Sequence, residues 1–192
     1  NDESHECAWE KVINDLAKKS GLNVTESKYI KFTEKTGCFL SRRFDRENGN
    51  RIHYASAMTM LGKTDGETAS YLDIAKFIKQ SSSNSEKDLK ELWSLAFNIA
   101  VSNTDDHLRN HGFLLKNDQW ELSPLFDITP NRYRHELSLN ITESDNSKSL
   151  ELLMETAPFY GIELLDAKNI AKNIFITVKE NWKPIAKKYG IP

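Results

Sequence analysis

Three polar residues near the middle of the chain have an order and a spacing that suit phosphoryl transfer. Asp105 precedes Asn110 by five positions, and Asp127 follows seventeen residues later. In such chemistry one Asp accepts or orients the proton of an attacking hydroxyl, while the Asn and the second Asp hold a metal ion against nucleotide phosphates. A loop of this length can turn back so that both of its side chains face one phosphoryl group. We therefore predict that the three side chains converge.

The segment between Asn110 and Asp127 has the pattern of a β-hairpin. Two strand-like runs, 111–115 and 119–122, flank a polar turn at 116–118. An Asp and an Asn at this spacing occur by chance in many proteins, but the added hairpin and the Asp before an apolar residue make the pattern much more specific. The alternative is that Asp105 and Asp106 end a helix in a polar loop and that Asn110 shapes a turn.

Apolar spacing predicts the elements that position this loop. A strongly apolar run indicates a buried helix over 86–102, capped by the polar run 81–85. This helix would place the loop that carries Asp105 and Asn110 at a cleft. The first helix is expected to begin at Asp2 or Ser4 and to end at Gly21. The other predicted elements are helices at 5–20, 71–79, 148–157 and 165–182 and strands at 27–32, 37–42 and 51–54, with a turn at 34–37. The predicted fold class is α+β and mainly helical.

Composition narrows the function classes. The chain has 192 residues, 39% of them hydrophobic, which is enough for one good core divided into a smaller and a larger part. A net charge of −2 argues against direct nucleic-acid binding or membrane-surface binding. Cys7 and Cys38 form no C-x-x-C pair and are expected to be free thiols. No long apolar run or signal-like segment is present, so a cytoplasmic protein is expected.

Two parts that an ATP-dependent kinase needs are absent from this sequence. The eight glycines form neither a G-x-G-x-x-G nor a Walker A pattern, and no nucleotide-binding Lys precedes the first helix. The chain starts with Asn rather than Met, so truncation is the first explanation; a partner that supplies these parts and an inactive relative are the others. Glu10 borders the apolar stripe of the first helix and could pair with such a Lys, but a solvated Glu10, or Glu6 in that role, suits the pattern as well.

Three motifs together resemble the HipA-like serine/threonine kinases, the toxins of bacterial toxin–antitoxin pairs. They are Arg43-Phe44-Asp45-Arg46, the run 104–110 and the run 122–128. The resemblance concerns the carboxy-terminal portion of that family and implies a kinase fold. Residues 1–45 would then be part of the upper lobe ending in the hinge, and 46–192 the helical lobe with the catalytic loop. It also implies ATP, Mg²⁺, a Ser or Thr hydroxyl on a protein substrate, in known members an aminoacyl-tRNA synthetase, and a DNA-binding antitoxin of the HipB type.

The same resemblance assigns roles to residues of this chain. Asp105 would be the catalytic base, and Asn110 and Asp127 the magnesium ligands. His107 would contact the γ-phosphate, or else hold the loop by bonding Asp127 or a backbone carbonyl. The side chain of Asp106 should point away from the cleft, so that Asp106→Asn retains most activity. The hinge residues implied to bind the nucleotide are Arg42, Phe44 and Asp45, to which Glu10 is added as the partner of the missing Lys.

Two other function classes remain open. The first is a non-catalytic interaction module that binds an antitoxin or another protein, which the missing phosphate loop and Lys favour. The second is a two-metal hydrolase built from Asp105, Asp106, His107, His111 and Asp127. The hydrolase is the weaker of the two, because the other His residues share no motif with this group. Oxygen ligands that include an Asn also suit Mg²⁺ better than zinc.

Overall fold

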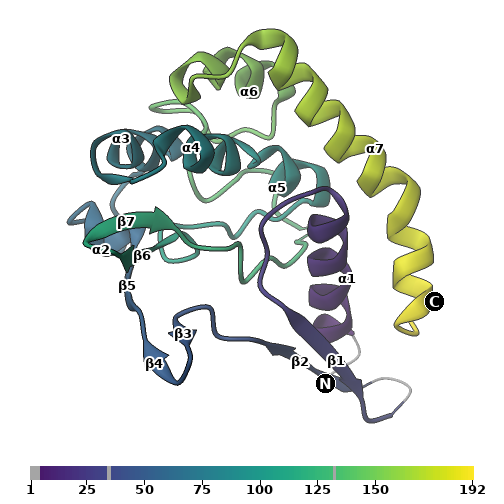
Figure 1. The fold of residues 1–192 in the computed structure, drawn as a ribbon. Coiled ribbons are helices and arrows are strands. Elements are labelled where there is room, and N and C mark those ends of the chain that lie inside the picture. Colours follow the sequence, from purple (N-terminus) through teal and green to yellow (C-terminus); the bar gives the residue numbers. More distant parts are fainter. Residues whose placement is uncertain (1–4, 34–35, 132) are drawn as a thin grey trace.

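The computed structural model describes residues 5–33, 36–131 and 133–192, and it confirms a mainly helical α+β fold (Figure 1). The described residues form three small sheets, which lie below and beside the helices. The helices are α1 (Glu6–Lys19), α2 (Ala57–Met60), α3 (Tyr71–Ser81), α4 (Ser85–Trp93), α5 (Ala96–Val101), α6 (Leu150–Thr156), the 3₁₀ helix η1 (Ala157–Tyr160) and α7 (Leu164–Lys188). The strands are β1 (Ser27–Lys31), β2 (Gly37–Ser41), β3 (Arg46–Glu47), β4 (Asn50–Arg51), β5 (His53–Ser56), β6 (Gly112–Lys116) and β7 (Gln119–Leu122).

Helix α1 forms as its amphipathic pattern predicts. Its buried stripe faces α7, which runs beside it in Figure 1. The helix ends at Lys19 and is followed by Gly21, which has a φ of 84°, and the backbone N–H of Leu22 donates to the carbonyl of Ala17 at 3.1 Å. Glycine adopts this left-handed conformation without the steric penalty that a Cβ brings. The two candidate caps, Asp2 and Ser4, lie outside the described residues.

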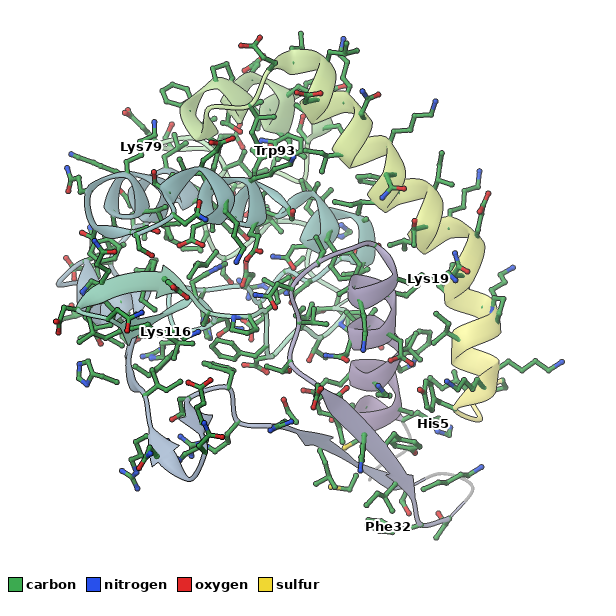
Figure 2. The ribbon with its side chains drawn as sticks, viewed as in Figure 1. His5, Lys19, Phe32, Lys79, Trp93 and Lys116 are labelled. Atoms are coloured by element: carbon green, nitrogen blue, oxygen red, sulfur yellow. The ribbon has the colours of Figure 1, made fainter. Side chains whose placement is uncertain are left out.

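Strands β1 and β2 form the predicted antiparallel hairpin, with Ser27 opposite Ser41 and Lys31 opposite Gly37. Of the predicted turn at 34–37, residues 34 and 35 lie outside the described residues. The hairpin packs on α1, and Figure 2 shows Phe32 at its far end, pointing away from the helices. One face of the hairpin therefore covers α1 and fixes the helix next to the chain that follows β2.

A second sheet carries the segment around the predicted chemistry. Strands β5, β6 and β7 form it in that order, all antiparallel, and the predicted 111–122 hairpin is confirmed as β6 and β7. The strand predicted at 51–54 instead begins at His53, because Asn50 and Arg51 pair with β3 in a separate small ribbon. The hairpin thus joins the end of one loop at Asn110 to the loop that carries Asp127.

The helix predicted over 86–102 is broken in two. After Trp93 the backbone N–H groups of Ser94 and Leu95 donate to carbonyls three residues earlier, Glu91 and Leu92, at 3.1 and 3.0 Å. This tighter winding ends α4 and reorients the chain before α5 starts. Asn84, rather than a serine, caps α4 by accepting the N–H of Lys87. Trp93 is fully buried between α4 and the α6 region (Figure 2).

Helix α7 is longer than the predicted 165–182 and continues through Pro184 to Lys188. The ring of Trp182 stacks on Trp9 with a centroid distance of 6.4 Å, which joins the far end of the chain to α1. Helix α6 begins at Leu150 and passes into η1, close to the predicted 148–157. Both cysteines are free thiols as expected. Among the described residues, no helix is both long and apolar enough to cross a membrane.

Candidate active site

The loop between α5 and β6 is held by backbone contacts to the chain that follows Asp127. Helix α5 ends at Ser102, which has a left-handed φ of 55°. The carbonyl of Ser102 accepts the N–H of Asn131 at 2.8 Å, and the carbonyl of Thr104 accepts the N–H of Ser138 at 3.0 Å. The loop that carries Asp105 and the loop after β7 are therefore neighbours, although more than twenty residues separate them in the sequence.

Of the three side chains predicted to converge, that of Asn110 contacts the main chain of Asp127, and that of Asp105 pairs with Arg134 instead. The side-chain amide Nδ2 of Asn110 donates to the backbone carbonyl oxygen of Asp127 at 3.2 Å. Asn110 is buried, whereas the side chain of Asp127 is exposed and its φ is 55°, in the left-handed region. The side chain of Asn110 therefore lies against the main chain of Asp127.

Asp105 lies at the surface and is paired with Arg134. The distance between Arg134 Nη1 and Asp105 Oδ1 is 3.4 Å, and both side chains are more than half exposed. Exposed pairs of this kind contribute about 0–1 kcal/mol, so the pair can open at little cost. Arg134 also approaches the hydroxyl of Ser138, which anchors it to the neighbouring loop. The carboxylate of Asp105 is thus accessible.

His107 forms the turn between Asp105 and Asn110. Its carbonyl accepts the N–H of Asn110 at 2.8 Å. Its ring nitrogen Nδ1 is buried and has no hydrogen-bond partner among the described residues. The sequence predicted Asp127 or a backbone carbonyl as an alternative partner of His107, but neither bonds this nitrogen. A buried polar atom without a partner is costly, and a ligand that supplies one would relieve that cost.

Asp106 was expected to point away from the cleft and to tolerate replacement by Asn, but the structure gives it a structural role. Its side chain does point into the protein, but it is buried and accepts hydrogen bonds from Tyr71, Asn98 and His111. Replacing a buried acceptor that holds several donors leaves those donors unsatisfied and costs free energy of folding. Asp106→Asn is therefore unsuitable as a neutral control.

A cavity of about 370 Å³ opens beside the Asp127 carboxylate. It lies where the β2 end, the following chain, α1 and the segment after β7 come together. Each predicted nucleotide-binding residue except His107 lines it. Its lining residues are Glu10, Asn14, Thr25, Phe39, Ser41, Arg42, Arg43, Phe44, Asp45, Tyr54, Phe126, Asp127 and Ile128. We call this space the front cavity. Asp105, His107 and Asn110 are not part of its wall.

Three aromatic rings form one side of the front cavity. The ring centroid of Phe44 lies 5.3 Å from that of Phe126 and 5.7 Å from that of Tyr54. Gly112 of β6 lies directly under the Tyr54 ring, and a Cβ at this position would clash with the ring. The glycine therefore lets Tyr54 lie flat over β6 and reach Phe44. Flat aromatic surfaces of this kind suit the face of a planar base.

Glu10 lines the front cavity and is half-buried, whereas Glu6 is exposed. Glu10 is therefore the better candidate for the partner of a nucleotide-binding Lys. Burial, and secondarily the carboxylate of Asp127, raises the pKa of Glu10 to about 7. Both causes disfavour the charged form, the first by removing water and the second by like-charge repulsion. A cation placed between Glu10 and Asp127 would reverse the second effect. Of the carboxylates that line the front cavity, Glu10 and Asp127 therefore repel each other, and a cation between them would stabilise both.

Asp45 is occupied by two arginines rather than open to a ligand. Arg43 donates to its two carboxylate oxygens at 2.8 and 2.6 Å, and Arg46 donates to Oδ2 at 2.7 Å. The hydrogen bond from Arg43 is the main reason that the pKa of Asp45 is lowered to about 2. In contrast, no backbone-to-backbone hydrogen bond of Phe44 is present in the described part of the chain. The hinge therefore offers backbone polar groups, with Asp45 fixing its shape.

The arrangement does not favour a two-metal hydrolase. Within the described ranges, no three His, Cys, Asp or Glu side chains gather as metal ligands. Asp106 and His111, two members of the proposed set, bond each other in the interior at 2.9 Å. One exposed carboxylate with an amide oxygen fits a magnesium ion that keeps other ligands from water or phosphates.

Several residues of the site were missed by sequence reasoning. Tyr54, Phe126 and Phe39 line the front cavity, but each occupies an ordinary apolar position of a strand or motif. Gly112 was the one sequence feature that could have indicated the contact with Tyr54, because a glycine inside a predicted strand often marks a close approach by another group. Arg134 could not have been found, since its contact with Asp105 spans 29 residues of irregular chain.

Comparison with known proteins agrees with this geometry. The profile of the HipA-like C-terminal domain family matches residues 2–182. Among solved structures, the chain is similar to HipA in the Shewanella oneidensis MR-1 toxin–antitoxin complex of HipA, HipB and operator DNA, with a TM-score of 0.76 and 17% identity over 97% of this chain and 49% of that chain. The chain thus spans about half the length of that relative.

A second solved structure has the same fold. It is the Helicobacter pylori proinflammatory kinase CtkA, with a TM-score of 0.59 and 13% identity over 96% of this chain and 85% of that chain. No curated protein sequence matches. The two structural likenesses confirm the predicted kinase-like fold, and the profile match covers nearly the whole chain. This chain belongs to the HipA-like C-terminal domain family.

Proposed function

We propose that this chain is the catalytic portion of a HipA-type serine/threonine protein kinase that uses ATP and Mg²⁺. The observation that carries the proposal is that Asn110 bonds the main chain of Asp127, and that Asp127 in turn lines a cavity with an aromatic wall. In phosphoryl transfer the enzyme contributes mainly positioning and charge stabilisation, and this arrangement brings metal ligands next to a space for a base.

The front cavity would hold the nucleotide. The adenine would pack against Phe44, which contacts Tyr54 and Phe126, and would hydrogen-bond the backbone between Arg42 and Asp45. Base-to-aromatic stacking is worth about 1–3 kcal/mol per base. Bonds between Asp45 and its two arginines support this proposal, because they hold the hinge in one conformation before a ligand arrives.

Asp127 and Asn110 would hold Mg²⁺ through their side-chain oxygens. These are the hard oxygen donors that magnesium prefers, and the exposed Asp127 carboxylate leaves room for phosphates and water. When bound, the ion supplies charge stabilisation for the phosphates. The raised pKa of Glu10, caused first by burial and then by Asp127, supports a place for a cation between these two carboxylates.

Asp105 would accept the proton of a Ser or Thr hydroxyl. Its accessible carboxylate can receive a protein side chain once Arg134 moves aside, and Arg134 would then be free to face the phosphoryl group or the substrate. His107 would donate from its unpartnered Nδ1 to a phosphate oxygen. General-base catalysis of this kind contributes about 10²- to 10⁴-fold.

We also propose a protein substrate, possible examples being the aminoacyl-tRNA synthetases modified by known family members, and an antitoxin partner of the HipB type. The similar HipA was solved as a complex with HipB and operator DNA, which supports the second part. The chain itself has a net charge of −2, so we assign DNA contact to the partner. The phosphate loop and nucleotide Lys, absent from this sequence, would come from elsewhere in the complete kinase.

Calorimetry of ATP binding to the full-length protein, with and without Mg²⁺, tests the proposal. Asp127→Asn should abolish the magnesium dependence of the ATP affinity. Asn is a better substitution than Ala here, because it tolerates the φ of 55°. Asp118→Asn is the matched control, since Asp118 is an exposed Asp with a φ of 61° in the β6–β7 turn. ATP binding without transfer to any hydroxyl would favour the non-catalytic interaction module, and absence of magnesium-dependent binding in the wild type would refute the kinase.

A further inference from the structure

The buried carboxylate of Asp106 joins three elements to the catalytic loop. Its Oδ2 accepts hydrogen bonds from Tyr71 Oη at 2.5 Å, Asn98 Nδ2 at 2.7 Å and His111 Nε2 at 2.9 Å. Tyr71 is the first residue of α3, Asn98 belongs to α5, and His111 immediately precedes β6. We call these four residues the Asp106 cluster. All four are buried, with exposed fractions from 0 to 6%.

A buried carboxylate without partners costs several kcal/mol, so the donors around Asp106 are needed to keep it in the core. Burial, together with the charge of Asp106, raises the pKa of Tyr71, which keeps the phenol protonated as a donor. Asn103 donates its amide to Asn98 Oδ1 at 3.1 Å and thereby turns the Nδ2 of Asn98 toward Asp106. Tyr71 thus remains a donor, and Asn98 is oriented by its second contact.

The position of the cluster in the sequence connects it with the proposed chemistry. Asp106 directly follows Asp105, and His111 directly follows Asn110. The hydrogen bond between Asp106 and His111 therefore joins the two ends of the catalytic loop. Next to these ends lie Asp105, the proposed general base, and Asn110, a proposed metal ligand. The carbonyl of His111 also accepts the N–H of Ala57 at 2.8 Å, which fixes that end of the loop to α2.

We propose that Asp106 and His111 are positioning residues that set the separation of Asp105 from Asn110. This inference rests on the proposed kinase function and adds to it the device that fixes the catalytic loop. None of the cluster residues lines the front cavity, so the cluster acts on the loop and not on the nucleotide. Loosening it should slow phosphoryl transfer and leave the ATP affinity measured without Mg²⁺ nearly unchanged. A displacement of about 1 Å can lower a rate by about 100-fold.

A small molecule could reach the Asp106 cluster through a second cavity, which is separate from the front cavity. This cavity of about 480 Å³, the back cavity, is lined by Asn98, Asn110 and His111 together with residues of α4 and α7. In His111→Ala, the space left by the ring would adjoin this cavity. Added imidazole could then occupy that space and donate to Asp106. Rescue by imidazole would show that a donor at this place is what the loop needs.

The test compares His111→Leu with His111→Gln in the full-length protein. Leu fills a similar space without a donor, whereas Gln can place an amide nitrogen near the position of Nε2. We expect Leu to lower kcat by about 10- to 100-fold with the ATP affinity measured without Mg²⁺ unchanged within about 2-fold, and Gln to restore most of the rate. Imidazole should raise kcat of His111→Ala in a saturable manner. Equal losses in Leu and Gln, or losses of kcat and ATP affinity in step, would overturn the proposal.

A second pair of variants guards against loss of folding. Tyr71→Phe removes one donor from Asp106, and Tyr160→Phe removes a buried hydroxyl that has no hydrogen-bond partner. Only Tyr71→Phe should lower kcat and increase hydrogen exchange in residues 103–111. Unchanged exchange there in both Tyr71→Phe and His111→Leu would overturn the positioning role. If the wild type transfers no phosphate, the kinase function is refuted. Faster hydrogen exchange in the variants would then still support the structural role of the Asp106 cluster.

Discussion

Glu10 gives the sharpest test of the charge arrangement in the front cavity. Its pKa is raised from 4.5 to about 7, first by burial and then by Asp127. The folded protein therefore holds a proton on Glu10 between these pH values, while the unfolded chain has lost it. Because the unfolded state binds fewer protons there, the free energy of unfolding must fall as pH rises from about 4.5 to about 7. Glu10→Gln removes this contribution.

The size of the effect follows from the two pKa values. A shift from 4.5 to about 7 corresponds to about 3 kcal/mol at 1.36 kcal/mol for each pH unit. Glu10 is only half-buried, and solvent screening reduces this figure to about 1 kcal/mol. We expect Glu10→Gln to gain about 1 kcal/mol relative to the wild type between pH 4.5 and 7.5, and to show no further relative change above that range.

Urea denaturation at a series of pH values, with EDTA present, measures this difference. Glu6→Gln is the matched control, because Glu6 lies exposed in the same helix, and its profile should parallel that of the wild type. Asp127→Asn should reduce the slope but not remove it, since Asp127 is the smaller of the two causes. If the wild type and Glu10→Gln keep a constant difference from pH 4.5 to 7.5, the account of Glu10 is wrong.

Three further predictions concern the proposed reaction. Asp105→Asn should lower phosphoryl transfer by about 10²- to 10⁴-fold with ATP affinity retained, as measured by radiolabelled transfer beside calorimetry; equal loss of affinity would show that Asp105 contacts the nucleotide. Phe44→Ala should weaken ATP binding by about 1–3 kcal/mol in the same calorimetry, and unchanged affinity would place the base elsewhere. Gly112→Ala should push the Tyr54 ring aside and cost about 1–3 kcal/mol of stability in urea denaturation, and a neutral result would contradict the close contact.

The parts of the site that could be predicted from sequence are those encoded locally. The alternation of residues 111–122 and the turn between them fix the β6–β7 hairpin, and the hairpin brings Asn110 to Asp127. Both residues lie at the ends of one short connection, so no distant contact was needed. The outline of the helices was predictable for the same reason, since apolar periodicity is a local property.

The parts that could not be predicted depend on contacts between distant segments. The Asp106 cluster needs Tyr71, which lies 35 residues before Asp106, and nothing in the sequence around Tyr71 indicates a buried donor. The break between α4 and α5 was missed because Ser94 interrupts an otherwise continuous apolar pattern without a Gly or Pro. The partners of Asp45 were within two residues of it, yet only the structure shows that the arginines occupy both carboxylate oxygens.

The surroundings of each carboxylate decide which of them can take part in chemistry. Asp45 is satisfied by arginines and Asp106 by buried donors, so both are committed to structure. Asp105 and Asp127 keep exposed side chains, and in the proposed reaction they would face a hydroxyl and a metal ion, respectively. Glu10 has no cationic partner among the described residues and carries a raised pKa, as expected of a carboxylate whose positive partner joins it only in the complete site. In the proposed reaction Asp105 and Asp127 would therefore be the acids still open to a ligand, because Asp45 and Asp106 are held by buried or bidentate partners.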